Sequence, residues 1–267
     1  MSAMVRTATS LVLAAFLSGC CGFLSSEEAR YEKNLECAGR ITDLKSIEIL
    51  AKGNFCCDPL PPGIQSLPEA RRFYLEKARS LKPDAVEPLL GLGRAYWDEG
   101  NYAEAQTCFQ LAAPRLDKPI YAEIAAVTMM RLQTRFDEGR ALAEKIRSEK
   151  GVDGEKVAEY LLGRLDFDAG QILAAQVHFE RALRRAEKGD YGLGGTPFTM
   201  RDAHFYLALI KHRRGDPQAA YQDFLVFLKK MSDPEFQIFY AYWLPRLKDD
   251  QGALLEKIER DWTHVRQ

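Results

Sequence analysis

Two stretches of this chain, 70 positions apart, carry nearly the same residues. Residues 92–100 read Leu-Gly-Arg-Ala-Tyr-Trp-Asp-Glu-Gly, and residues 162–170 read Leu-Gly-Arg-Leu-Asp-Phe-Asp-Ala-Gly. A spacing of this size fits two units of about 34 residues with a small insertion, so we predict an internal repeat. The residues that follow at equal offsets are Tyr102, Ala105, Phe109 and Ala112 in the first stretch and Ile172, Ala175, Phe179 and Ala182 in the second.

Each unit is predicted to fold as two antiparallel helices that cross at small residues. Gly93 and Gly163 let the backbones approach, and large residues fill the gaps beside them. Gly100 and Gly170 stand where a left-handed residue ends one helix before the next begins. Because one helix pair cannot bury its apolar face alone, several pairs must stack. No long alternating run of Val, Ile and Thr proposes a strand, so we expect an all-α fold, an α-solenoid of antiparallel helix pairs.

The pattern resembles the tetratricopeptide repeat. That family carries Leu-Gly, then Tyr, a turn residue, and Tyr, Ala, Phe, Ala and Pro in order, and residues 86–119 agree with it at Leu92, Gly93, Tyr96, Tyr102, Ala105, Phe109 and Ala112. Residues 120–151, 156–189 and 201–234 fit in phase with fewer agreements; Asp166, for example, stands where the family prefers Tyr. The resemblance implies a right-handed superhelix whose first helices line a concave groove.

The first 20 residues have the features of an export signal. Arg6 precedes a short apolar core at residues 8–17, which is about half of the roughly 20 residues that a membrane span needs. Leu17-Ser18-Gly19-Cys20 follows at once and resembles the lipobox of bacterial lipoproteins. The resemblance implies that Cys20 is acylated, and the absence of Asp at position 21 implies an outer-membrane anchor facing the periplasm. An ordinary secreted protein with a chance cysteine is the alternative.

The regions around the repeats divide the chain into four parts. Ala78 and Pro83 stand where an earlier repeat would end, but residues 54–62 cannot be a normal first helix, and the Cys/Pro-rich stretch at 56–63 is expected to be a rigid irregular loop. Phe236, Phe239, Tyr240 and Trp243 form one stripe of a late helix, either a cap on the last repeat or a partner-binding face. The expected parts are a signal peptide at 1–19, a tether with N-terminal helices and the loop at 20–63, the repeat array at 64–234, and capping helices at 235–267.

The six cysteines leave an odd number once Cys20 is acylated. In an oxidising compartment Cys37 can close a loop of about 20 residues with either Cys56 or Cys57. Free thiols are the alternative, and a metal site is disfavoured because adjacent cysteines do not easily bind one tetrahedral ion together. Cys108 is expected to be a small buried residue.

Composition argues against nucleic acid and against catalysis. Lys and Arg number 37 against 38 Asp and Glu, so the net charge of −1 does not attract a polyanion. The four histidines are scattered, and no metalloprotease, serine-hydrolase or thiol-protease motif occurs. We therefore expect a non-enzyme that binds no cofactor and no metal.

The remaining class of function is the binding of a protein partner. The family resemblance implies that the partner binds to the first helix of each repeat. Aromatic residues interleaved with Arg are typical of protein-binding surfaces. We expect a lipid-anchored scaffold or assembly factor, similar in architecture to pilotins and to lipoproteins of outer-membrane assembly; the alternative is a component of a tripartite solute transporter that binds a small ligand. The expected groove residues are Arg94, Trp97, Asp98, Tyr121, Arg131, Tyr160, Arg164, Phe167, Asp168, Phe205, His212 and Arg213.

Overall fold

The computed structural model describes residues 26–42, 57–186 and 200–229, with the single positions 253, 256 and 260. Within these ranges the regular structure is helical and no strand occurs, as the sequence predicts. None of the described helices has the length and apolar composition to cross a membrane. The signal peptide with Cys20, the second loop cysteine Cys56, and the aromatic stripe at 236–243 lie outside the described residues.

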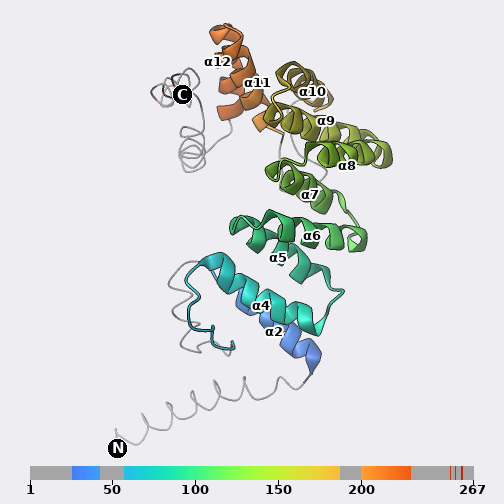
Figure 1. The fold of residues 1–267 in the computed structure, drawn as a ribbon, viewed down its shortest axis with the longest axis vertical. Coiled ribbons are helices and arrows are strands. Elements are labelled where there is room, and N and C mark those ends of the chain that lie inside the picture. Colours follow the sequence, from blue (N-terminus) through green and yellow to red (C-terminus); the bar gives the residue numbers. More distant parts are fainter. Residues whose placement is uncertain are drawn as a thin grey trace, which may run out of the picture. The chain divides into compact units, whose positions relative to one another are not determined.

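The chain divides into two compact units, Met1–Met129 and Met130–Gln267. In the first unit, α4 packs against both α2 and α5, and α5 also packs against α6 (Figure 1). A short 3-10 turn, Ala113–Arg115, follows α6, and the division between the units falls within α7. The helices are α2 (Glu27–Gly39), α4 (Leu67–Leu81), α5 (Val86–Asp98), α6 (Tyr102–Ala112) and α7 (Ile120–Leu132).

The second unit continues the pattern of consecutive helices packed one on the next (Figure 1). Helix α9 contacts α8 and α10, and α11 contacts α10 and α12. The fold is thus an α-solenoid built of helix pairs. The helices are α8 (Phe136–Glu149), α9 (Gly151–Asp168), α10 (Ile172–Arg185), α11 (Asp202–Arg213) and α12 (Pro217–Leu228).

The small residues at the helix crossings are where the sequence places them. A Cβ atom added to Gly93 would lie 2.8 Å from Cε1 of Phe109, and one added to Gly163 would lie 2.7 Å from Cδ1 of Phe179. Both phenylalanines are fully buried. Each glycine therefore provides the space that the ring of the following helix fills, which confirms the predicted crossing.

The turns within the helix pairs share one backbone geometry. Gly100, Gly170 and Gly215 have φ of +81°, +78° and +81°, the left-handed region that glycine adopts at low cost. In each turn the next residue donates its N–H to a carbonyl five positions back, as Asn101 does to Tyr96 at 2.8 Å. Thr134, with φ +59°, takes the same place between α7 and α8. Among the described residues it is the one non-glycine with positive φ.

A buried polar ladder joins α8, α9 and α10. Arg140 on α8 donates to Asp166 on α9 at 2.8 Å. Arg147, also on α8, lies 3.4 Å from Glu159, which is seven residues before Asp166 on α9. His178 on α10 lies between both carboxylates, with Nδ1 2.7 Å from Glu159 and Nε2 3.5 Å from Asp166. Asp166, which stands where the family pattern has Tyr, therefore has a partner for each of its carboxylate oxygens, as buried polar groups require.

Helix α2 takes the place of the first helix that the Cys/Pro-rich loop cannot form. It packs along α4, whose start is fixed by a capping box between Ser66 and Glu69. Arg71 on α4 donates to the carbonyl of Ile41 at 2.9 and 2.6 Å, just beyond α2. The boundary predicted between residues 63 and 64 therefore falls inside a helix pair, because α2 and α4 share one core.

Candidate functional site

The triple Arg94, Trp97 and Asp98 forms an open surface on α5, called here the α5 face. The Arg94 side chain is 60% exposed, and its Nε donates to Asp98 at 2.9 Å. Its guanidinium also lies over the Trp97 ring, 5.2 Å from the centroid, and Trp97 is half-buried. These contacts stay within one helix. The exposed guanidinium therefore lies next to a half-buried indole and a carboxylate of the same helix.

The corresponding triple on α9 has a different environment. The Arg164 side chain is only 18% exposed, and its Nη1 donates to Asp202 on α11 at 2.9 Å. The same nitrogen donates to the Tyr160 hydroxyl at 2.8 Å, and the guanidinium lies 4.7 Å from the ring centroid of Tyr206. Arg164 therefore ties α9 to α11. Arg164, expected in the groove, is corrected to a residue that holds two helices together.

Tyr160 belongs to this internal cluster. Its hydroxyl donates to Asp202 at 2.6 Å, and its side chain is buried. Burial raises the pKa of Tyr160 well above its ordinary value, with the Asp202 carboxylate adding to the rise. The phenol therefore remains a neutral donor, and Tyr160 is corrected from a groove residue to a structural one.

Other predicted groove residues also serve the helix stack. Phe205 is fully buried and packs against Phe224, with ring centroids 5.5 Å apart, so a partner cannot contact it. Arg131 forms an ion pair with Asp168 in the second unit, and little of its side chain remains exposed. Tyr121 lies edge-on against Phe109 in the first unit at 6.3 Å, and it is half-buried.

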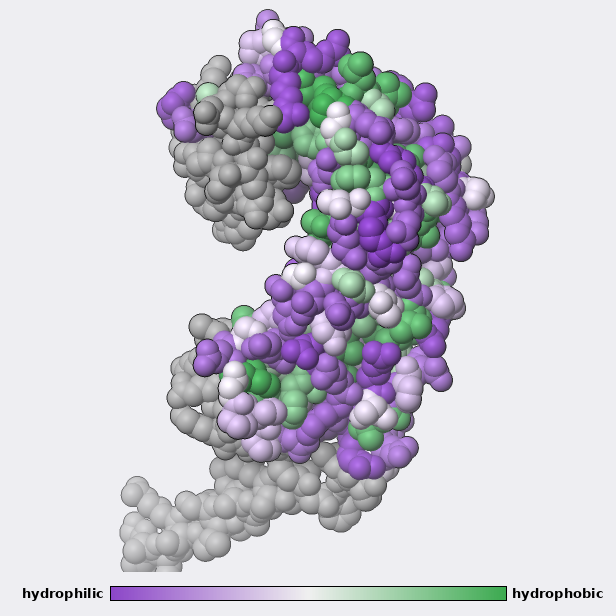
Figure 2. Space-filling model, in the orientation of Figure 1, coloured by the Kyte–Doolittle hydropathy of each residue, from purple (hydrophilic) through white to green (hydrophobic). Residues whose placement is uncertain are grey.

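A smaller set of second-unit residues keeps exposed atoms. Phe167 is half-buried, while Asp168 and Arg213 are exposed. The Arg213 guanidinium lies 5.7 Å from the centroid of the Phe167 ring, and His212 beside it is half-buried. On the face drawn in Figure 2, the described residues are mainly hydrophilic, with hydrophobic residues in small groups. The accessible part of the predicted groove is therefore aromatic and charged, as protein-binding surfaces commonly are.

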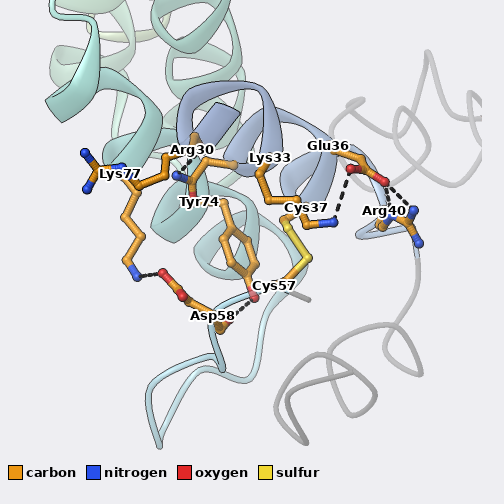
Figure 3. Close-up of a disulfide and its surroundings, with 10 residues drawn as sticks. Arg30, Lys33, Glu36, Cys37, Arg40, Cys57, Asp58, Tyr74 and Lys77 are labelled. Atoms are coloured by element: carbon orange, nitrogen blue, oxygen red, sulfur yellow. Dashed lines mark hydrogen bonds and ion pairs between the residues drawn. A yellow bond between two sulfur atoms is a disulfide. The ribbon is translucent and has the colours of Figure 1, made fainter. Parts of the chain in front are cut away.

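The structure joins Cys37 to Cys57 in a disulfide (Figure 3), the second of the two pairings that the sequence left open. Both cysteines are buried, at 1% and 5% exposure. Cys108 is buried and unbonded. In the part of the chain that the structure describes, no group of three or more His, Cys, Asp or Glu is arranged to hold a metal ion.

The chain is similar in sequence to known repeat proteins. Residues 68–127 match the model of the family described as tetratricopeptide repeat. Tetratricopeptide repeat protein 5 of Mus musculus is 29% identical over 140 residues, which cover 49% of this chain and 32% of that protein. The chain thus spans about a third of that relative's length.

Two solved structures match part of this chain with low sequence identity. "MamA 41-end from Desulfovibrio magneticus RS-1" is 18% identical, with 61% of this chain and 85% of that chain covered and a TM-score of 0.45. "MamA RS-1 ArsTM double mutant" is 16% identical, with coverage of 74% and 93% and a TM-score of 0.48.

Proposed function

We propose that this chain, which is similar to tetratricopeptide-repeat proteins, is a protein-interaction scaffold held at a bacterial membrane by lipid on Cys20. The observation that carries the proposal is the α5 face, where an exposed Arg94 lies beside the half-buried Trp97 ring and is paired with Asp98 on the same helix. Aromatic and Arg side chains supply most hot spots of protein interfaces. The α5 face has both, in a repeat that matches the family model.

The exposed chemistry suits a protein rather than a nucleic acid. The chain has a formal net charge of −1, and Asp98 lies beside the one exposed guanidinium of the face. A phosphate backbone would be repelled by that carboxylate, whereas a polypeptide offers both backbone carbonyls and apolar side chains. Guanidinium groups bind carbonyls and carboxylates, and the indole ring covers apolar groups.

The proposed location outside the cytoplasm has support from two independent features. The sequence Leu17-Ser18-Gly19-Cys20 after a short apolar core has the spacing of a lipobox. The buried Cys37–Cys57 disulfide is the type of bond that forms and persists in oxidising compartments. Two or three acyl chains on Cys20 would make the anchor effectively permanent. We place the protein on the outer membrane, facing the periplasm, because Asp is absent at position 21.

Site-specific photo-crosslinking in cells tests the binding surface. A photo-reactive amino acid replaces Asp98 on the α5 face, and in a matched control it replaces Gln110, an exposed residue on α6 in the same unit. We expect a discrete protein adduct from position 98 and none of the same size from position 110. Equal adducts at both positions, or none at 98, would reject the α5 face as the binding surface.

The anchor is tested separately with Cys20→Ser. The variant is expected to incorporate no labelled palmitate and to leave the membrane fraction. Equal labelling of the variant and the unmodified chain would refute lipidation at Cys20, and it would leave the crosslinking result unaffected.

A further inference from the structure

Helix α2 is attached to the first unit by few apolar side chains. Of its 13 residues only Tyr31, Cys37 and Ala38 are buried. Helix α5 has the same length and buries five residues. Because burial must offset the entropy lost on ordering each residue, noncovalent packing holds α2 less strongly than it holds α5.

Beyond the end of α2, Ile41 is buried in the shared core and accepts hydrogen bonds from Arg71, and on the helix Leu35 packs partly against the same core. The other noncovalent contacts of α2 are polar and partly solvated. Lys82, which follows α4, forms an ion pair with Glu28 in which both side chains are at least a third exposed. The Tyr31 hydroxyl donates to Glu87 at 3.1 Å, and the Lys82 ammonium lies 4.2 Å from the centroid of the Tyr31 ring. Exposed pairs of this kind contribute little to stability.

Cys57, in contrast, is fixed to α4 independently of α2 (Figure 3). The carbonyl of the next residue, Asp58, accepts a hydrogen bond from the Tyr74 hydroxyl at 2.5 Å. The Asp58 carboxylate forms an ion pair with Lys77, and Leu60 is buried in the same core. The bond from Cys57 to Cys37 therefore connects α2 to a segment that α4 already holds.

We propose that the Cys37–Cys57 disulfide is a lock, so that α2 docks stably on α4 only after the two thiols are oxidised. The two thiols form one S–S bond and pass two electrons and two protons to an oxidising disulfide, which becomes a dithiol. A dithiol reductant reverses the exchange. Cross-linking residues separated by 20 positions favours the closed form by about a hundredfold on the loop-entropy model.

The lock determines which surface of the first unit is open. In the oxidised chain Ala70 and Tyr74 of α4 are covered in one core with Cys37, Ala38 and Ile41. In the reduced chain this side of α4 is accessible. If the chain is exported as proposed above, α2 docks only in the oxidising compartment; the lock itself does not depend on that location.

Amide hydrogen exchange on the purified chain tests the lock. Four samples are compared: the oxidised protein, the protein reduced with an excess of a small dithiol, Cys37→Ala with Cys57→Ala, and the control Cys108→Ala. Cys108 is buried in the same core but forms no disulfide. We expect amides of residues 27–39 to exchange about a hundredfold faster in the reduced and doubly substituted proteins, with α5 and α6 unchanged. The Cys108→Ala variant should protect α2 as the oxidised protein does.

Two results would overturn the proposal. If α2 stays protected in the reduced and doubly substituted proteins, it docks without the bond. If α5 and α6 lose protection together with α2, the bond stabilises the whole unit rather than locking one helix. Neither result depends on whether the α5 face binds a partner or Cys20 carries lipid.

Discussion

Replacing Arg164 and Arg94 separately distinguishes a stack residue from a surface residue. Arg164→Ala removes the Nη1 bonds to Asp202 and Tyr160 and leaves the Asp202 carboxylate, which is 30% exposed, without its cation. Breaking a mostly buried charged pair of this kind costs about 3 kcal/mol. In a chain of this size that lowers Tm by roughly 10 °C.

Arg94→Ala is the matched control. It removes an exposed pair between Arg94 and Asp98 on one helix, which is worth about 0.3–0.5 kcal/mol, so Tm should fall by no more than about 1–2 °C. Thermal unfolding followed by circular dichroism measures both variants, and capture of the crosslinked partner is measured alongside. We expect Arg164→Ala to lose stability and Arg94→Ala to lose capture. Equal Tm values for the two variants would refute the distinction between their environments.

Three further predictions follow from local geometry. Gly93→Ala or Gly163→Ala brings a Cβ within 2.8 Å of a buried Phe ring and should destabilise by about 2 kcal/mol in denaturant unfolding, whereas Gly39→Ala, with nothing within 4 Å, should not; equal midpoints would contradict the crossing. Thr134→Gly relieves a positive φ and should raise stability by up to about 1 kcal/mol; a lower Tm than the unmodified chain would show that Thr134 is not strained. Although burial alone would raise it, hydrogen bonds from His204 and Lys211 hold the pKa of Asp223 below its ordinary value, so the stability that this carboxylate contributes is lost as pH falls below about 4. Acid titration of unfolding should show a smaller loss for Asp223→Asn, and identical pH profiles would exclude this contribution.

Local sequence patterns were sufficient to predict the helix pairs. The glycines at the crossings and turns have one physical role each, and that role depends on the neighbouring residues in the same repeat. Gly93 leaves space for the ring of Phe109, and Gly100 adopts the left-handed φ of the turn between them. All three residues belong to one repeat unit, so the sequence of that unit is sufficient to predict the helix pair.

The environments of the two arginine triples could not be predicted in the same way. Arg94 and Arg164 occupy equivalent positions in their repeats, but Arg164 is enclosed by Asp202 and Tyr206 of a later repeat. Asp202 lies 38 positions after Arg164 in the sequence. The difference therefore depends on packing between repeats, which the repeat pattern itself does not specify.

The packing of α2 on α4 was also not predicted, because it too depends on contacts between helices that are separate in the sequence. The Cys/Pro-rich loop indicated that a normal first helix was absent before α4, and N-terminal helices were expected within residues 20–63. Only the packing of α2 on α4 shows that α2 takes the place of the first helix that is missing before α4. The cysteine spacing, which allowed Cys37 to reach Cys57, was the available signal.

The affinity of the purified chain for the protein crosslinked at position 98 tests the proposed function most directly. The comparison uses Trp97→Ala on the α5 face and Leu111→Ala, an exposed apolar residue on α6 of the same unit, with Kd measured by titration calorimetry. Loss of an aromatic hot spot should raise Kd at least about tenfold, while Leu111→Ala should leave Kd unchanged, and circular dichroism should show both variants folded at the temperature of the titration. Binding of Trp97→Ala with unchanged Kd would contradict the account.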